Sequence, residues 1–165
     1  MKRLLEIPEY VEDVKRVASL DLPWGKLCDK TILITGGTGL IGSFLIDVLA
    51  SAHLGCTVLL FGRSEDKAKA RFAEYWNAGW IRFVKWDVAS ATLPMVAGAV
   101  DYVLHLASNT HPVAYATDPI GTIATNVIAL NNLLALASEK KASRFLFASS
   151  NEIYGENRGD TELFD

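Results

Sequence analysis

The sequence predicts an α/β fold: a doubly wound parallel sheet of about five strands in a three-layer αβα arrangement. Short apolar or β-branched runs alternate with longer helical patterns along the chain, which is typical of βαβ units. One of these runs leads directly into a glycine-rich loop and then into a helix. With 165 residues, 50% of them hydrophobic and 21% charged, the chain is long enough to bury the core of one domain.

The five strands are predicted from short runs that are apolar almost throughout. A parallel sheet that is covered on both faces requires such runs, because side chains on both faces of each strand are buried. The strands are expected at Thr31–Thr35, Thr57–Phe61, Ile81–Trp86, Asp101–Ala107 and Arg144–Ala148.

Helical patterns separate these strands. After the first strand, Ser43–Ala52 is predicted to form a helix with an apolar face toward the sheet. That face is expected to hold Phe44, Leu45, Val48 and Leu49. Ser64 is suited to cap the next helix, which is expected to run to about Trp76 with acidic side chains in its first turn.

Two more helices are predicted, one before the first strand and one between the fourth and fifth strands. Residues 8–20 carry valines at a spacing of three, which predicts an amphipathic helix packed on the outside of the domain. A short irregular or helical stretch around Pro94 precedes the fourth strand, and Pro119 then starts a long helix. The apolar stripe of this long helix is expected to be Ile123, Val127, Leu130 and Leu134.

The loop ITGGTGLIGS, residues 34–43, joins the first strand to the following helix. A pyrophosphate is bound by backbone N–H groups at a helix N-terminus, which it can approach closely only where no Cβ intervenes. Gly36, Gly39 and Gly42 suit a tight turn, close approach to phosphate and close helix packing, respectively. The loop therefore predicts a Rossmann-type dinucleotide-binding domain at 31–165, preceded by an N-terminal helix and connecting segment at 1–30.

The glycine spacing, G-x-x-G-x-x-G, is one residue longer than the common dinucleotide fingerprint. A glycine-rich turn that binds nothing is the plainer interpretation of the same residues. An NTPase phosphate loop would end in Gly-Lys-Ser/Thr, which is absent here. The position of the loop between a buried strand and a helix favours the dinucleotide.

With Thr35 in front, the loop resembles the TGxxGxxG of short-chain dehydrogenases/reductases. Later motifs resemble the N-terminal part of the extended branch, the nucleotide-sugar-modifying NAD-dependent epimerase/dehydratase family: Asp87 after the third strand, His105-Leu106-Ala107-Ser108 at the end of the fourth, and the run from Ser149 to Gly155 after the fifth. The resemblance implies cofactor contacts from Thr35, Gly36, Gly39, Leu40, Ile41, Gly42, Arg63, Asp87, Val88, Leu106, Ala107, Ser108 and Asn126.

The resemblance implies particular roles for some of these residues. Asp87 is similar to the aspartate that holds the adenine amino group. Asn126 is similar to an asparagine that steadies the active site, although a helical Asn that faces solvent is an equal interpretation. Ser150 matches the hydroxyl that hydrogen-bonds the reacting sugar oxygen in the family.

Glu152 is the second catalytic candidate. The family's 4,6-dehydratases resemble T-D-E at this point, its uronate decarboxylases carry T-x-E, and its 4-epimerases usually lack the Glu. This chain has Ser150-Asn151-Glu152, which favours decarboxylase-like or dehydratase-like chemistry, while Asn151 cannot supply the proton of the dehydratase Asp. A solvated or helix-capping carboxylate is the plainer interpretation of Glu152.

The family's Tyr-x-x-x-Lys pair, in which Tyr removes the hydroxyl proton and Lys lowers the pKa of that Tyr, is missing. No tyrosine in the sequence has a lysine four residues later. The polar, acidic segment 155–165 also carries no feature that closes a domain. The chain is therefore expected to be the cofactor-binding part of a longer enzyme, inactive by itself, with a non-catalytic dinucleotide-binding or regulatory module as the alternative.

The choice between NAD and NADP stays open at this stage. NAD-selective enzymes place an acid at the end of the second strand, and this chain has none there. Arg63 with Ser64 suits a 2′-phosphate and NADP, but Arg63 suits adenine stacking or solvent equally well. Enzymes that regenerate their cofactor within one cycle more often use NAD.

Charge and composition narrow the remaining partners. With 16 basic and 19 acidic side chains, neither nucleic acid nor an anionic membrane is expected to bind. No apolar signal core and no run of transmembrane length are found, so the cytoplasm is the expected location. Cys28 and Cys56 are expected to be reduced, and His53 and His111 lack ligands at metal-binding spacing.

The resemblance also bears on assembly. The substrate implied for the complete protein is a nucleotide sugar. Relatives form a homodimer through the long helix after the fourth strand and through the helix that carries Tyr and Lys. The second helix is missing from this sequence, so the usual interface of two helices is not expected. A homodimer stays open as a partner, and exposed apolar surface is expected.

Overall fold

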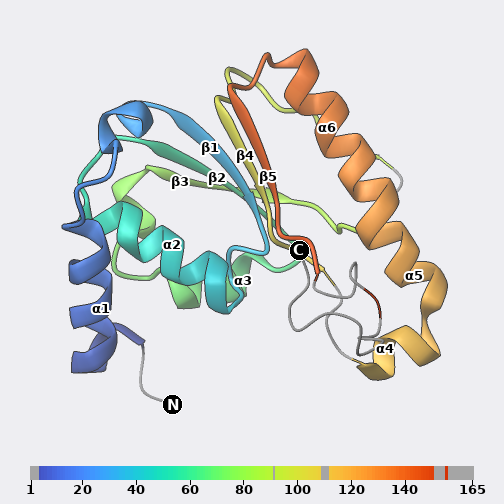
Figure 1. Ribbon diagram of the computed structural model, residues 1–165, viewed down its shortest axis with the longest axis horizontal. Coiled ribbons are helices and arrows are strands. Elements are labelled where there is room, and N and C mark those ends of the chain that lie inside the picture. The colour runs from blue at the N-terminus through green and yellow to red at the C-terminus, as the bar shows by residue number, and fades with distance from the viewer. Residues whose placement is uncertain (1–3, 91, 109–111, 151–154, 156–165) are drawn as a thin grey trace, which may run out of the picture.

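The fold is a five-stranded parallel sheet with helices on both faces, as a computed structural model shows for residues 4–90, 92–108, 112–150 and 155 (Figure 1). The strand order is β3-β2-β1-β4-β5, so the chain reverses direction across the sheet between β3 and β4. The strands are β1 (Thr31–Thr35), β2 (Thr57–Gly62), β3 (Ile81–Lys85), β4 (Tyr102–His105) and β5 (Arg144–Phe147). The predicted fold class and all five predicted strands are confirmed.

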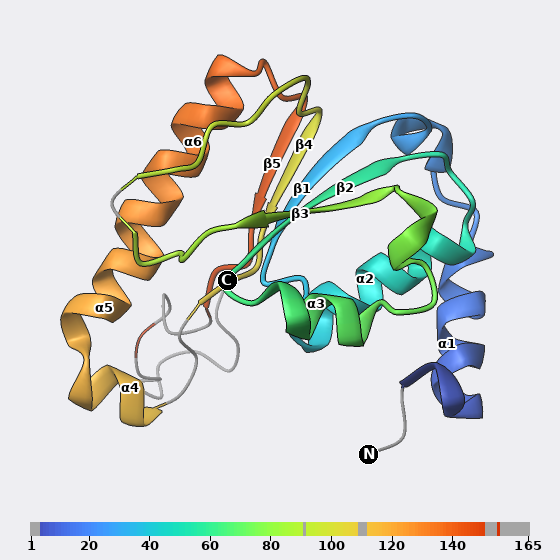
Figure 2. The same ribbon diagram turned by 180° about the vertical axis from the view of Figure 1, so that it is seen from behind.

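The helices divide between the two faces of the sheet. One face is covered by α2 and α3, with α1 packed on the outer side of α2, and the other face is covered by α6, which α5 precedes in the same long helix (Figures 1 and 2). The α-helices are α1 (Pro8–Ala18), α2 (Leu40–Ser51), α3 (Glu65–Arg71), α4 (Pro112–Thr117), α5 (Pro119–Ile123) and α6 (Ala129–Glu139). Three 3₁₀ turns, η1 (Leu4–Glu6), η2 (Trp24–Leu27) and η3 (Trp76–Ala78), and one π-helical turn, η4 (Ala124–Ile128), complete the described elements.

Two of the predicted helix boundaries are clearly wrong, and one helix was missed. Helix α2 begins at Leu40 instead of Ser43, because Gly39 is its N-cap and the glycine loop leads straight into the first turn. Ser64 caps α3 by accepting from the backbone N–H of Lys67 at 3.3 Å, as predicted. However, α3 ends at Arg71, well before Trp76. The next side chain, Phe72, is fully buried. Helix α4 was not predicted.

The long helix after β4 presents a different face to the sheet from the one predicted. Ile123, Val127 and Leu134, from the predicted stripe, are 59%, 60% and 46% exposed. The buried face consists instead of Thr125, Ala129, Leu133, Leu136 and Ala137. Ala129, Ala137 and Thr125 let the helix lie close to the sheet, and Leu133 and Leu136 fill the core between them.

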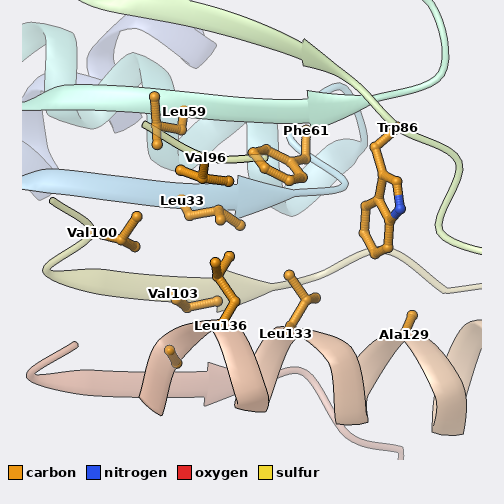
Figure 3. Packing of buried hydrophobic residues seen from close by; sticks show 11 residues of the cluster. Leu33, Leu59, Phe61, Trp86, Val96, Val100, Val103, Ala129, Leu133 and Leu136 are labelled. Atoms are coloured by element: carbon orange, nitrogen blue, oxygen red, sulfur yellow. The ribbon is translucent and has the colours of Figure 1, made fainter. Parts of the chain in front are cut away.

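The expectation that no segment reaches transmembrane length is also wrong. The continuous helix Pro119–Glu139 has 21 residues and a mean hydropathy of 1.5 over its most apolar window, which would suffice to cross a membrane by length and composition alone. Its inner face, however, is part of the core of this domain. Figure 3 shows Ala129, Leu133 and Leu136 of this helix directed toward the sheet.

Two apolar clusters fill the spaces above and below the sheet. In β1, alternate side chains enter different clusters: Leu33 packs toward α6, whereas Ile32 and Ile34 pack toward α2 and α3. Figure 3 shows the first cluster, in which Leu33 and Phe61 from the sheet face the α6 side chains. Each strand of the centre is thus buried on both faces, which explains its nearly continuous apolar sequence.

A buried polar cluster fixes the N-terminal helix to the rest of the domain. Asp47 of α2 is 0% exposed at its side chain and forms an ion pair with Arg71 at the end of α3. The hydroxyl of Tyr10, on α1, donates to Asp47 Oδ2 at 2.6 Å, and the hydroxyl of Tyr75 donates to Oδ1. Burial, together with Asp47, raises the pKa of Tyr10 to about 12, so this hydroxyl stays protonated at neutral pH. The predicted packing of this helix on the outside of the domain is confirmed.

Replacing Asp47 by Asn should destabilise the protein strongly, because the guanidinium of Arg71 would keep its charge in a largely buried place with no counter-charge. Breaking a buried pair in this way costs about 3–5 kcal/mol of the free energy of unfolding. Urea titration followed by circular dichroism measures the loss. The control is Asp13→Asn, which breaks the exposed pair with Arg16 and should change stability by less than about 0.5 kcal/mol. Equal losses in the two variants would contradict the prediction.

Candidate functional site

A cleft of about 780 Å³ lies at the carboxyl edge of the sheet. It is lined by the loop from β1 to α2, by the segments that follow β2, β3 and β4, and by the start of the α5–α6 helix. The chain after β1 leads to β2 on one side, and the chain after β4 leads to β5 on the other, so the two segments diverge at this edge. Open α/β sheets bind ligands at such a point, where the strand order reverses.

Twelve of the thirteen predicted cofactor contacts line this cleft. They are Thr35, Gly36, Gly39, Leu40, Ile41, Gly42, Arg63, Asp87, Val88, Leu106, Ala107 and Ser108. The thirteenth, Asn126, does not line the cleft, but its Oδ1 accepts a hydrogen bond from the Ser108 hydroxyl at 2.7 Å. The structure therefore brings together residues from four separate segments that the sequence motifs had selected.

The glycine loop is shaped mainly by contacts within the protein. Gly36 has a φ of 70°, and a Cβ at this position would lie 2.7 Å from the backbone nitrogen of Ala107. A Cβ at Gly42 would lie 2.5 Å from the carbonyl oxygen of Gly36. Gly39 is less restricted, since its Cβ would meet only that same oxygen, at 3.1 Å. Gly39 is the N-cap of α2, whose first N–H groups have no partner within the helix and suit an anion.

Gly37 has a role that the motif did not indicate. A Cβ at Gly37 would lie 2.4 Å from Leu60 Cδ1 and 3.0 Å from Ile46 Cδ1, so the loop packs directly on the core at this residue. Both glycines are therefore required by close contacts. Gly36 packs against the backbone after β4, and Gly37 packs against the core side chains beneath α2.

The hydroxyl of Thr35 connects the ends of β1 and β4. Its Oγ1 accepts from the backbone N–H groups of Leu106 and Ala107, at 3.2 and 3.1 Å, and lies 2.8 Å from Nδ1 of His105. Thr35 and His105 are 1% and 0% exposed. Burial lowers the pKa of His105, and the backbone carbonyl of Thr125 opposes this effect, so the imidazole is neutral at physiological pH.

Several residues that line the cleft were not predicted. They are Thr38, Phe61, Gly62, Trp86, Ala89, Asp118, Gly121, Thr125 and Ala148. Asp118 could have been found, because it precedes Pro119 at the expected helix start; its Oδ1 accepts from the N–H of Gly121 at 2.9 Å. Thr125 and Ala148 carry no comparable feature, since only the packing of the long helix and of β5 brings them to this edge.

The two catalytic candidates follow β5 in the sequence. Ser150 is exposed and follows Ala148, which lines the cleft. Glu152 lies outside the described residues. No group of three or more His, Cys, Asp or Glu side chains that could hold a metal ion occurs in the part of the chain that the structure describes. Cys28 and Cys56 are both free cysteines.

Comparisons with known proteins identify relatives of this domain. The sequence model of the family described as "NAD dependent epimerase/dehydratase family" matches residues 32–164. UDP-glucuronic acid decarboxylase 4 of Arabidopsis thaliana is 33% identical over 76% of this chain and 27% of its own length. UDP-glucuronic acid decarboxylase 1 of Danio rerio is 37% identical over 77% of this chain and 29% of its own length. The chain thus spans less than a third of either curated relative.

Solved structures show the same architecture. A UDP-N-acetylglucosamine 4-epimerase from Methanobrevibacter ruminantium M1, in complex with UDP-N-acetylmuramic acid, superposes with a TM-score of 0.69 at 25% sequence identity. The match covers 84% of this chain and 43% of the epimerase. The shared part is therefore most of this chain and less than half of the epimerase.

Replacing Gly36 by Ala should destabilise the domain more than the same replacement at Gly79. Both glycines have a positive φ, which costs a residue with a side chain about 1–2 kcal/mol, but a Cβ at Gly79 would have no atom within 4 Å. The overlap with Ala107 should add about 1–3 kcal/mol to the loss in Gly36→Ala. Urea unfolding of both variants measures the difference. If the two losses are equal, the contact between the loop and the end of β4 does not constrain Gly36.

Proposed function

The chain belongs to the NAD-dependent epimerase/dehydratase family, and on this premise we propose that it is the cofactor-binding part of an enzyme that transiently oxidises a sugar hydroxyl of a nucleotide sugar. The observation that carries the proposal is the gathering of the glycine loop, Asp87 and the segment after β4 around one cleft. The curated relatives at 33% and 37% identity are UDP-glucuronic acid decarboxylases. UDP-glucuronic acid is accordingly the substrate that we propose for the complete protein.

The residues of the cleft fit a nicotinamide dinucleotide. The pyrophosphate would lie at the N-terminus of α2, next to Gly39, where neither a Cβ nor a charged side chain blocks the backbone. Asp87 would accept from the adenine amino group, and Leu106 with Ala107 would line the path toward the nicotinamide. When bound, the nicotinamide supplies the hydride acceptor of the reaction. The protein residues orient it and hold the substrate.

We further propose roles for the residues after β5. The Ser150 hydroxyl would hydrogen-bond the reacting sugar oxygen, because Ala148, two residues earlier, already lines the cleft. Glu152 would serve a decarboxylase-like step as the carboxylate nearest in sequence to Ser150. Asn126, through its bond to Ser108, would hold the segment after β4 in place.

NAD is the cofactor that we propose, since the matching family is NAD-dependent. Arg63 nevertheless lies in the cleft, exposed, at the end of β2, where a 2′-phosphate would be bound. The segment after β2 would therefore suit NADP as well, and Arg63 is the residue that would set the ratio of the affinities for NAD and NADP.

We also propose that a second copy of the chain covers the outer face of the α5–α6 helix, where Ile120, Ile123 and Val127 are 79%, 59% and 60% exposed. Large apolar side chains gathered on one helix face are typical of an interface. The cytoplasm is the proposed location of this soluble assembly.

A non-catalytic dinucleotide-binding module is the second candidate. The residues of this chain include no Tyr-x-x-x-Lys pair, which would supply the general base, so the cleft is compatible with this candidate as well. A module would bind the dinucleotide without converting any sugar in the complete protein. The two candidates thus share the cleft and differ in what the residues after β5 do.

The chain alone should bind NAD but release no CO₂ from UDP-glucuronic acid, because the general base is missing. Isothermal titration calorimetry measures the binding, and trapping of labelled CO₂ measures the reaction. The Danio rerio UDP-glucuronic acid decarboxylase 1 provides the positive control for turnover. Release of CO₂ by the chain alone would contradict this prediction, and absence of NAD binding would contradict the proposed function itself.

Arg63→Ala should weaken NADP binding about tenfold or more and NAD binding less than about threefold, because a charge-assisted bond to the 2′-phosphate contributes about 1.5–3 kcal/mol. Competitive titration of both dinucleotides measures the two ratios. Arg144→Ala is the matched control, since Arg144 is an exposed arginine at the start of β5, at the opposite edge of the sheet. Equal loss of both dinucleotides in Arg63→Ala would exclude a contact that is specific to the 2′-phosphate.

A further inference from the structure

His105 is a completely buried imidazole directly behind the cleft. It ends β4, is 0% exposed, and stacks on the ring of Phe147 from β5 with 5.4 Å between ring centroids. Its Nδ1 lies 2.8 Å from Thr35 Oγ1, at the end of β1. His105 therefore contacts the neighbouring strand on each side, and the residues that follow it line the cleft.

The hydrogen bonds of Thr35 determine which ring nitrogen carries the proton. A hydroxyl oxygen has two acceptor positions and one proton to donate. Both acceptor positions are used, by the N–H groups of Leu106 and Ala107. The hydroxyl proton is then donated to His105 Nδ1, which must be unprotonated. In a neutral imidazole, the proton is consequently on Nε2.

The other ring nitrogen is directed to the helix that covers this side of the sheet. Within the described residues, Nε2 is buried and has no hydrogen-bond partner at normal geometry. The backbone carbonyl of Thr125 is the polar group that acts on the ring from this helix. Thr125 belongs to η4, the π-helical turn, and itself lines the cleft. π-Turns inside α-helices are frequent at functional sites because they redirect backbone groups.

We propose that His105, as the neutral Nε2–H tautomer, is a positioning residue for the cofactor cleft. It fixes the direction of the Thr35 hydroxyl, and this hydroxyl in turn holds the backbone of Leu106 and Ala107. The link to the cofactor rests on the proposed function; the tautomer and the held backbone do not.

The position of Ala107 matters for the glycine loop because the backbone of Ala107 touches that of Gly36. The nitrogen of Ala107 is the atom that a Cβ on Gly36 would meet at 2.7 Å. A shift of Ala107 of a few tenths of an ångström would therefore change the space available to Gly36. On the other side, Ser108 is bonded to Asn126 of η4. His105 thus lies between the glycine loop and η4, behind the segment 106–108 that contacts both.

The first experiment determines the tautomer in the unaltered chain. Long-range ¹H–¹⁵N correlation spectra of the labelled protein distinguish a protonated ring nitrogen from an unprotonated one for each of the three histidines, with His105 assigned by His105→Asn. The expected result is an unprotonated Nδ1 and a protonated Nε2, retained at pH values below about 6.5, where an unperturbed imidazole gains its second proton. A proton on Nδ1 at neutral pH would overturn the proposal.

The second experiment compares two replacements of the imidazole. In His105→Asn, the side-chain oxygen can take the place of Nδ1 as acceptor, whereas His105→Leu keeps the volume and removes the acceptor. The amide protons of Leu106 and Ala107 should exchange with solvent about tenfold faster in His105→Leu, and close to the rate of the unaltered chain in His105→Asn. Unchanged exchange in His105→Leu would overturn the proposal.

The third measurement connects the residue to the cofactor. By calorimetry, His105→Leu should bind NAD about tenfold more weakly, His105→Asn should stay within about threefold, and Thr35→Val combined with His105→Leu should add little to either single change. Additive losses would show that the two side chains act separately and would overturn the proposal. If the unaltered chain does not bind NAD, the proposed function fails, while the tautomer and amide-exchange results still decide the role of His105.

Discussion

The close approach of two backbone segments is the constraint on which the cleft depends. The segment after β1 and the segment after β4 touch at Gly36 and Ala107. The hydroxyl oxygen of Thr35 accepts hydrogen bonds from the backbone N–H groups of Leu106 and Ala107 in the second segment. No side chain could be placed between these segments. The glycine at the end of β1 is therefore required first by the protein itself, and the open helix N-terminus that suits a phosphate is a consequence of the same turn.

This ordering explains which parts of the site could be predicted from the sequence. The glycine loop, Asp87 and the segment after β4 are local features that follow directly on strands, so a sequence motif is enough to find them. Thr125 and Ala148 reach the cleft only through the packing of α6 and β5 on the sheet. Their places depend on contacts between elements far apart in the chain, and no local pattern records such contacts.

The same distinction holds for the fold. Strands buried on both faces have nearly continuous apolar sequences, and all five were predicted for that reason. The long helix was predicted as an element, but its buried face was assigned incorrectly, because large apolar side chains such as Ile123 and Val127 dominate the hydrophobic pattern. The face that packs on the sheet mixes leucines, Leu133 and Leu136, with the small Ala129 and Ala137, which a hydrophobic pattern weights little. Helix α3 ends early at Phe72, the C-cap residue, whose side chain is fully buried although the backbone has left the helical conformation.

The buried charge of Asp47 shows how the N-terminal helix becomes part of this domain. The family match begins at residue 32, so α1 lies outside it, yet Tyr10 of α1 donates to a carboxylate that is completely buried on α2. A buried carboxylate is costly unless its oxygens are fully paired. Tyr10 and Arg71 share Oδ2 of Asp47, and the Arg71 guanidinium also donates to the Tyr10 hydroxyl at 3.0 Å, so α1 takes part directly in the pairing of this charge. The helix is therefore held by the pairing of a buried charge as well as by apolar contact, and removing α1 would take away one of the donors to the Asp47 carboxylate that links α2 to α3.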